Sequence, residues 1–315
     1  MSDIRLGVIG AGNISQEHLK VIKAMDGVNV AGMTSRTISK VEELAETYAI
    51  EQVYENIDSL IKKCTLDALM ILVSATQIYD VTKKLLPTNI PLFIEKPPGL
   101  APEQTKTLAK AAKQHGTKNM VGFNRRYYSI FHKGLEIINK HGQLLGVAVE
   151  GHERFWKIIN SSYPKAVIEN WIYANSTHTI DLLRFFGGEI NSISSLSKSL
   201  KEKNGDQFVA SMEFESGTLG TYTSHWYSPG GWTATLFSEG ATVKFNPLEK
   251  GVWIDTDFNE NEIQPDEVDL KYKSGFYKQM EAFINMIKNG KLDWPGMDIA
   301  DSLKTMELAQ HFSRA

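Results

Sequence analysis

The sequence predicts a doubly wound α/β domain at the N-terminus, followed by an α+β domain built on a mostly antiparallel sheet. Three observations support this fold class. The chain has 315 residues, whereas one domain typically holds about 100–200. Up to residue 124, short apolar runs alternate with amphipathic stretches, and beyond residue 125 strand-like runs follow one another directly. We therefore expect a first domain over 1–124 and a second over 125–315.

The first domain alternates predicted strands and helices. Continuous Val, Ile and Leu runs are typical of strands covered on both faces, and strand–helix alternation favours a parallel sheet with right-handed crossovers. The predicted strands are Ile4–Ile9, Val28–Met33, Leu66–Val73, Ile90–Ile94 and Asn119–Phe123. The predicted helices are Ser15–Met25, Ser39–Tyr48, Asn56–Lys63, Ile78–Leu86 and Pro102–His115.

The second domain contains successive strands with turn residues between them. Gly217, the Pro229-Gly-Gly run and Glu239-Gly240 supply turn chemistry. The predicted strands are Val147–His152, Ile190–Ser197, Gln207–Phe214, Leu219–Trp226, Thr233–Phe237 and Thr242–Phe245. Only Thr179–Phe186, Phe276–Lys288 and Asp298–Phe312 have a helical pattern. Helices grouped apart from strands are typical of an α+β domain.

Composition excludes several classes of protein. With 34 Lys+Arg against 37 Asp+Glu, the formal net charge is −3, so the chain is a poor candidate for binding nucleic acid. Cys64 is the only cysteine, and no Cys/His cluster has zinc spacing, so no metal site is expected. The longest apolar run, Ala68–Val73, is far shorter than the roughly 20 residues that span a bilayer. Without a signal-peptide pattern, we expect a cytoplasmic protein that contacts no membrane.

A glycine loop follows the first predicted strand. Gly10, Gly12 and Ser15 occupy the small-residue positions of the dinucleotide fingerprint G-x-G-x-x-G/A, with Asn13 and Ile14 after the second glycine. The first glycine permits a tight turn, the second lets the backbone approach a pyrophosphate, and the next helix N-terminus favours negative charge. Because a strand precedes this loop and a helix follows it, we expect Gly10, Gly12, Asn13 and Ile14 to bind a dinucleotide.

The segment after the second predicted strand indicates which dinucleotide binds. NAD-binding proteins usually place an Asp or Glu on the ribose hydroxyls there, but this chain has Ser35, Arg36 and Thr37. A carboxylate would repel a 2′-phosphate, whereas the two hydroxyls can hydrogen-bond it and Arg36 can pair with it. We therefore expect NADP(H) as the preferred cofactor. The alternative is NAD(H), because Arg36 can stack on adenine in either cofactor.

Lys96 stands at the end of the fourth predicted strand, within Glu95-Lys96-Pro97. Ligands of doubly wound sheets bind outside the carboxyl ends of the strands, so we expect Lys96 to face the nicotinamide. A lysine in this place can exchange protons with a substrate hydroxyl. The other interpretation is a solvated lysine at a strand end.

These motifs together resemble a known family. The glycine loop, Ser35-Arg36, Glu95-Lys96-Pro97 and Gly122-Phe123-Asn124-Arg125-Arg126 resemble the Gfo/Idh/MocA family of glucose-fructose oxidoreductase and inositol dehydrogenase-like enzymes. The resemblance implies a Rossmann domain followed by a domain with a large open sheet, whose exposed face commonly makes oligomer contacts. It therefore implies a homodimer or homotetramer assembled through the C-terminal sheet.

The resemblance also implies catalytic residues. Family members often carry Asp-x-x-x-His followed by x-x-Asp, and His178 and Asp181 match the second and third positions, while Ala174 replaces the first Asp. An imidazole has an ordinary pKa of about 6.5, which suits general acid/base work. Asp181 lies one helical turn later and would either orient that ring or fix the helix. Tyr173 and Asn175 are candidates to replace the missing acid.

Further site residues follow from the same resemblance. Glu95 and Arg125 belong to the two motifs next to the cofactor. In the third-strand loop, relatives usually show Pro-x-x-x-His, where this chain has Ala75 and Tyr79; we expect both to contact the cofactor. Tyr163 and Trp171 precede His178 and are candidates for the substrate pocket.

The expected function is hydride transfer between a nicotinamide and a carbinol or carbonyl carbon of a sugar, cyclitol or nucleotide-sugar. Lys96 and His178 would handle the hydroxyl proton. One alternative is a catalytically silent NAD(P)-binding regulatory protein of the same fold, which the Ala174 substitution favours. Another is an enzyme of the family that acts on a substrate other than a sugar.

Overall fold

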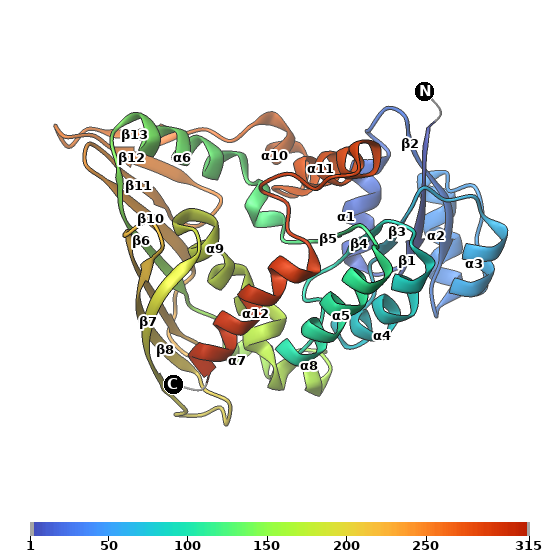
Figure 1. Ribbon diagram of the computed structural model, residues 1–315, viewed down its shortest axis with the longest axis horizontal. Coiled ribbons are helices and arrows are strands. Elements are labelled where there is room, and N and C mark those ends of the chain that lie inside the picture. The colour runs from blue at the N-terminus through green and yellow to red at the C-terminus, as the bar shows by residue number, and fades with distance from the viewer. Residues whose placement is uncertain (1–2, 314–315) are drawn as a thin grey trace. The chain divides into compact units, whose positions relative to one another are not determined.

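The computed structural model describes residues 3–313, and its first sheet confirms the predicted parallel architecture (Figure 1). Five strands are paired in the order β2-β1-β3-β4-β5, every pair parallel. The strands are β1 (Ile4–Ile9), β2 (Val28–Thr34), β3 (Ala68–Ile71), β4 (Leu92–Ile94) and β5 (Asn119–Val121). The helices around them are α1 (Asn13–Ile22), α2 (Ile38–Tyr48), α3 (Ile57–Lys63), α4 (Ala75–Leu85), the 3₁₀ turn η1 (Leu86–Thr88) and α5 (Pro102–His115).

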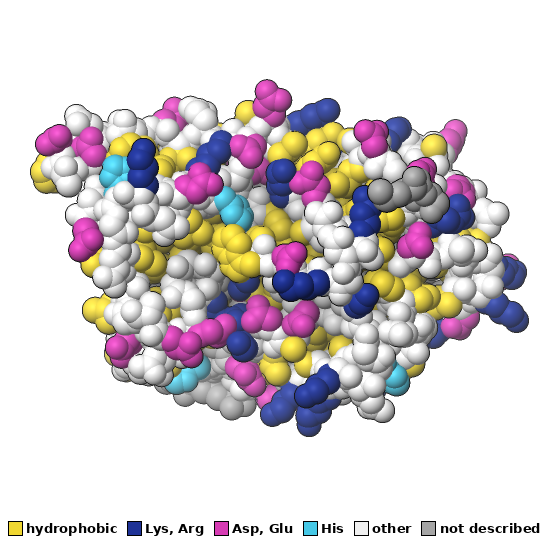
Figure 2. Space-filling view, turned by 45° about the horizontal axis from the view of Figure 1, so that its top comes forward, with side chains coloured by type: hydrophobic (Ala, Val, Ile, Leu, Met, Phe, Trp, Pro, Cys, Tyr) yellow, Lys and Arg dark blue, Asp and Glu magenta, His cyan; other side chains and the backbone are white. Residues whose placement is uncertain are grey.

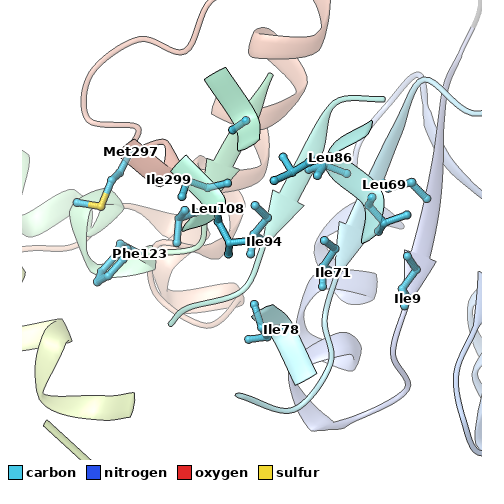
Figure 3. Packing of buried hydrophobic residues seen from close by; sticks show 14 of the residues in the cluster. Ile9, Leu69, Ile71, Ile78, Leu86, Ile94, Leu108, Phe123, Met297 and Ile299 are labelled. Carbon is cyan, nitrogen blue, oxygen red and sulfur yellow. The ribbon is translucent and has the colours of Figure 1, made fainter. Parts of the chain in front are cut away.

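Alternate strand residues point to opposite faces of this sheet. On one face, Leu69, Ile71 and Ile94 join a buried cluster with Ile78 of α4 and Leu108 of α5 (Figure 3). On the other face, the ring of Phe93 contacts His18 of α1 and Phe283 of α11 (Phe276–Asn289) edge to face. The sheet is therefore buried on both sides, as its unbroken apolar strands predict.

The chain divides into two units in a way that the sequence prediction missed. One unit comprises the chain up to Asn124 together with Lys271–Leu303, and the other comprises Arg125–Leu270 and the chain from Lys304. Residues 271–303 were expected in the second domain. They belong to the first because α11 packs on its sheet and because the Val121 N–H donates to the Met297 carbonyl at 2.7 Å. The last helix, α12 (Ile299–Ser313), begins in the first unit and ends in the second.

The second unit contains a mostly antiparallel sheet of eight strands, as predicted. The order is β13-β12-β11-β10-β6-β9-β8-β7, and only β6 and β9 pair in parallel. The strands are β6 (Leu144–Gly151), β7 (Ile190–Lys198), β8 (Gln207–Phe214), β9 (Leu219–His225), β10 (Trp232–Ser238), β11 (Thr242–Phe245), β12 (Gly251–Ile254) and β13 (Glu260–Ile263). Strands β12 and β13, at one end of the sheet, were not predicted from their short sequences.

Helices α6 (Ser129–Lys140) and α9 (Thr177–Gly187) pack against the same sheet. Helix α6 was not predicted, since Gly134 interrupts its apolar pattern. The structure explains that glycine: a Cβ there would lie 2.5 Å from the Phe245 ring, so only glycine permits this close approach of helix to sheet. The remaining short elements of this unit are the 3₁₀ turn η2 (Asn124–Tyr127), α7 (Phe155–Ile158), α8 (Lys165–Glu169), the π-helical turn η3 (Ile172–Ser176) and α10 (Glu267–Lys271).

The molecular surface carries charges of both signs. On the face drawn in Figure 2, Lys and Arg side chains are interspersed with Asp and Glu side chains. Within residues 3–313, no helix is both long and apolar enough to cross a membrane.

Candidate active site

The glycine loop between β1 and α1 has the geometry that a bound pyrophosphate requires. Gly10 has φ +120°, and a Cβ there would lie 2.3 Å from the Leu72 carbonyl oxygen. A Cβ on Gly12 would instead meet no heavy atom within 4 Å, so space stands open above that residue. The hydroxyl of buried Ser15 donates to the Gly10 carbonyl at 3.0 Å and holds the loop closed.

The N-terminus of α1 is suited to an anion. Gly12 is the N-cap residue, so no side chain caps the helix, and the first turn carries no acidic residue. The first N–H groups of a helix have no intrahelical acceptor, and the helix dipole adds partial positive charge there. Loop and helix therefore fit the diphosphate of a nicotinamide dinucleotide, which Gly10, Gly12, Asn13 and Ile14 would hold.

A cavity of about 530 Å³ opens beside this loop, and we call it the glycine-loop cavity. It is formed by the glycine loop, the loop after β2 with the start of α2, the residues that lead into α3, and the segment after β3 with α4. Its lining includes Gly10, Gly12, Ile14, Ser35, Arg36, Thr37, Lys40, Glu55, Ser74, Gln77 and Lys84. The loop after β2 thus contributes two hydroxyls and the Arg36 cation to the wall of the cavity, and α2 adds the Lys40 cation. Ser35 accepts from the Thr37 N–H at 3.1 Å, which fixes the turn that presents Arg36.

Two expected cofactor residues do not line this cavity. Among the described residues that follow β3, Ser74 and Gln77 line it, whereas Ala75 and Tyr79 do not; Ala75 and Tyr79 lie in helix α4 and not in a loop. Tyr79 packs against the buried cluster of the first unit, and the Lys83 ammonium lies 5.7 Å from the centre of its ring. The expectation therefore named a segment beside the cavity, but not the side chains of that segment that line it.

Glu95 is held in place beneath Lys96. One carboxylate oxygen lies 2.8 Å from Nε2 of His18 on α1, which is fully buried, and the other accepts from the Lys96 N–H at 3.1 Å. The Lys96–Pro97 peptide is cis. Glu95 therefore fixes the backbone of Lys96, and His18, which the sequence analysis left out of the site, fixes Glu95.

A second cavity, of about 470 Å³, lies within the second unit, and we call it the tryptophan cavity. It brings together four residues that the sequence singled out: Arg125, Tyr163, Trp171 and Asn175. Its lining also includes His152, Glu153, Arg154, Trp232 and Glu249. The Arg125 guanidinium stacks 4.5 Å from the centre of the Trp232 ring, and burial lowers the pKa of Arg125. Arg125 was expected at the cofactor.

His178 lies on α9 behind this wall. Its ring centre is 5.9 Å from that of Trp232, and the residue is only 6% exposed. Tyr173 lies at the π-helical turn before α9, with its hydroxyl 3.4 Å from that of Ser313. Neither His178 nor Tyr173 lines the tryptophan cavity as the described residues form it.

Asp181 is engaged by neighbours in the interior of the second unit. Its two carboxylate oxygens accept from Nε and a terminal nitrogen of Arg126 at 2.7 and 2.8 Å, and one also accepts from the Thr305 hydroxyl at 2.9 Å. The residue is 1% exposed. Of the two roles considered for Asp181, this geometry favours the one that fixes the helix.

Glu153 is another residue beside the predicted site that the sequence did not single out. It follows β6, is 4% exposed, and accepts from Asn175 Nδ2 at 3.0 Å and from the Ser176 hydroxyl at 2.8 Å. The signal available in the sequence was a lone acid among His152, Arg154 and aromatic residues at a strand end.

Across residues 3–313, no group of three or more His, Cys, Asp or Glu side chains is arranged to hold a metal ion.

Fold and glycine-loop geometry together define a dinucleotide-binding Rossmann domain. The model of the oxidoreductase family with an NAD-binding Rossmann fold matches residues 4–123, and that of the GFO/IDH/MocA C-terminal domain matches residues 149–244. The two models together match more than half of the chain. The chain therefore belongs to the GFO/IDH/MocA family.

Individual relatives are distant. A scyllo-inositol 2-dehydrogenase (NAD(+)) of Bacillus subtilis is 23% identical over 301 residues, which cover 91% of this chain and 87% of that protein. The "Uncharacterized oxidoreductase YrbE" of the same organism is 23% identical, and the match covers 68% of this chain and 64% of that protein. Among solved structures, an oxidoreductase from Agrobacterium radiobacter in complex with NAD+, L-tartaric acid and magnesium superposes with a TM-score of 0.79 at 13% identity, covering 98% of this chain and 95% of that chain.

Proposed function

We propose that this oxidoreductase transfers a hydride between NADP(H) and a carbinol or carbonyl carbon of a sugar, cyclitol or nucleotide-sugar. The observation that carries the proposal is the tryptophan cavity. It combines broad aromatic faces, from Trp171 and Trp232, with hydrogen-bonding groups such as Glu153 and Asn175. Ligand sites typically pair apolar walls with a few convergent polar groups, and a sugar ring presents both CH surfaces and hydroxyls.

The bound nicotinamide would supply the hydride acceptor or donor. Lys96 and His178 are proposed as the groups that take up and return the hydroxyl proton. Removing that proton as the hydride leaves avoids a free alkoxide, and such proton transfer is typically worth about 10²–10⁴ in rate. The contacts of Asp181 support a positioning role for it rather than a chemical one.

The preference for NADP(H) rests on the loop after β2 and the first turn of α2. Ser35, Arg36, Thr37 and Lys40 line one wall of the glycine-loop cavity, and none of them is an acid. Two cations and two hydroxyls suit a 2′-phosphate. Titrating the protein with NADPH and NADH in parallel tests this preference: we expect the lower Kd for NADPH in the wild type and a loss of that difference in Arg36→Ala.

We further propose a homo-oligomer assembled through the eight-stranded sheet. Leu196 and its cross-strand neighbour Val209 are 77% and 45% exposed. Leu219 and Phe237 are 63% and 40% exposed and flank Gly146 on neighbouring strands. Exposed apolar side chains on several strands of one sheet support an interface, and light scattering would measure the mass. A cytoplasmic location remains a prediction from the sequence.

Turnover on a panel of polyols tests the proposed reaction. Myo-inositol, scyllo-inositol and common aldoses are offered with NADP+ and with NAD+, and the absorbance of the reduced nicotinamide is followed. We expect oxidation of at least one polyol, faster with NADP+. Binding of cofactor without turnover on any of these compounds would instead favour the regulatory alternative.

A further inference from the structure

We infer that Glu153 is the carboxylate that binds a substrate hydroxyl in the tryptophan cavity. The inference rests on the proposed function and identifies the ligand as an uncharged polyol. It starts from a vacancy in the sequence pattern: Ala174 stands where relatives carry Asp, and its side chain is 6% exposed.

Glu153 reaches the same segment from a different part of the chain. Asn175 and Ser176, which directly follow Ala174, both donate to its carboxylate, one to each oxygen. A carboxylate offers about four acceptor positions, so it can hold these two donors and also accept from a ligand hydroxyl. The π-helical turn at Ile172–Ser176 presents both donors to Glu153, and such turns occur frequently at functional sites.

The other groups around the cavity suit a hydroxyl, which both donates and accepts. The Trp171 side chain is almost fully buried at the cavity wall, and its indole Nε1–H has no acceptor among the described residues. Arg125 contributes further N–H donors at the same wall. Leaving a buried donor unpaired costs free energy, so a ligand oxygen that accepts from Trp171 would restore the missing hydrogen bond.

Charge balance identifies the ligand as uncharged. Two cations, Arg125 and Arg154, and two carboxylates, Glu153 and Glu249, line the cavity. With formal charges that cancel, the cavity offers no excess of positive charge for a phosphate or a sugar acid. It suits an uncharged polyol, for which one carboxylate acceptor and several N–H donors provide directional hydrogen bonds.

The test compares four proteins: wild type, Glu153→Gln, the double variant Glu153→Gln with Ala174→Asp, and Glu215→Gln. Glu215 is exposed after β8 and serves as the matched loss of a carboxylate. For each protein, kcat and KM for myo-inositol, or for the best polyol of the panel, are measured together with the Kd for NADPH and the Tm.

Hydrogen bonds to charged groups contribute about 1.5–3 kcal/mol, which corresponds to about 10–150-fold in kcat/KM. We expect Glu153→Gln to lose that much in kcat/KM while its Kd for NADPH stays within about twofold. Adding Ala174→Asp should restore about tenfold, because it supplies an acid from the neighbouring position, whereas Glu215→Gln should behave as wild type.

Two results would overturn the inference. One is a kcat/KM of Glu153→Gln within about threefold of wild type. The other is a loss that accompanies a lowered Tm and that Ala174→Asp does not rescue, since Glu153 would then merely anchor the π-helical turn. Absence of turnover by the wild type would count against the proposed function. In that case, tryptophan fluorescence measures whether Glu153 contributes to polyol binding. Quenching by myo-inositol in wild type but not in Glu153→Gln would support binding, and equal responses would contradict it.

Discussion

At the residue scale, Lys96 is the proposed proton-transfer group whose backbone is fixed by hydrogen bonds of neighbouring residues. Glu95 accepts from its backbone N–H, and buried His18 in turn holds Glu95. The lysine therefore stands on a backbone that two buried side chains fix. A rigid support of this kind is what a group that must meet a substrate hydroxyl requires.

Replacing Lys96 by Met should lower kcat by about 10²–10⁴, because proton transfer to the hydroxyl is lost. The Kd for NADPH should stay nearly unchanged, since the glycine-loop cavity does not include Lys96. Steady-state kinetics with a cofactor titration measure both quantities. Lys106→Met, at an exposed position of α5, is the matched control. Full activity of Lys96→Met would remove Lys96 from the mechanism.

His152 predicts a pH dependence of stability. Desolvation lowers its pKa below 6.5, and its Nδ1 accepts from the His225 N–H at 3.1 Å, which requires that nitrogen to be unprotonated. Because the unfolded chain then binds the proton more readily, this contribution to stability is complete above about pH 6.5 and is lost as the pH falls toward the lowered value. Urea unfolding of His152→Gln should show a weaker loss in that range than wild type. The exposed residue His115 provides the control variant His115→Gln. If the free energy of unfolding depended on pH equally in wild type and in His152→Gln, this assignment would be contradicted.

At the scale of elements, the two glycines of the glycine loop are predicted to have different roles, Gly10 in folding and Gly12 in cofactor binding. Gly10→Ala should lower the free energy of unfolding by about 1–3 kcal/mol, because its φ is positive and its Cβ would meet the Leu72 carbonyl. Gly12 has φ −91° and open space at its Cβ, so Gly12→Ala should fold normally.

Cofactor affinity should nevertheless fall at least about tenfold in Gly12→Ala, because the added methyl group occupies the approach of the pyrophosphate. Denaturant unfolding and an NADPH titration of the two variants decide the matter. Unchanged affinity in Gly12→Ala would show that the dinucleotide binds elsewhere.

Helix α9 depends on a buried ion pair. Asp181 and Arg126 lie in the interior with two short hydrogen bonds between them. Breaking a buried pair by removing one charge costs about 3–5 kcal/mol. We expect Asp181→Asn to lose that much in denaturant unfolding, whereas exposed Asp257→Asn should lose almost nothing. Loss of activity at unchanged stability would point instead to a direct role beside His178.

The elements themselves differed in how far the sequence predicted them. Strands with continuous apolar runs were found close to their expected positions, and β1, β8 and β11 have the predicted bounds. Helix α6 was missed because Gly134, required by close packing on Phe245, weakens its pattern. Strands β12 and β13 were missed because they are short and their register depends on neighbouring strands.

At the scale of the whole molecule, the features that the sequence did not predict depend on contacts between residues far apart in the chain. Residues 271–303 belong to the first unit because α11 contacts Phe93 and because Met297 accepts a hydrogen bond from Val121. Both contacts join residues that are far apart in the chain. The same holds for the tryptophan cavity. The sequence singled out three residues of this cavity, namely Tyr163, Trp171 and Asn175. It could not identify Glu153 as a site residue, because that depends on its hydrogen bonds to the π-helical turn.

The most direct test of the central claim follows the hydride itself. The wild-type protein is incubated with NADP+ and with myo-inositol, or the best polyol of the panel, that carries deuterium on its carbinol carbons. Mass spectrometry of the reduced cofactor then shows where the deuterium has gone. The proposed reaction predicts one deuterium in the reduced nicotinamide, at a rate that Lys96→Met lowers. Reduced cofactor without deuterium, or none at all with any polyol and either cofactor, would contradict it.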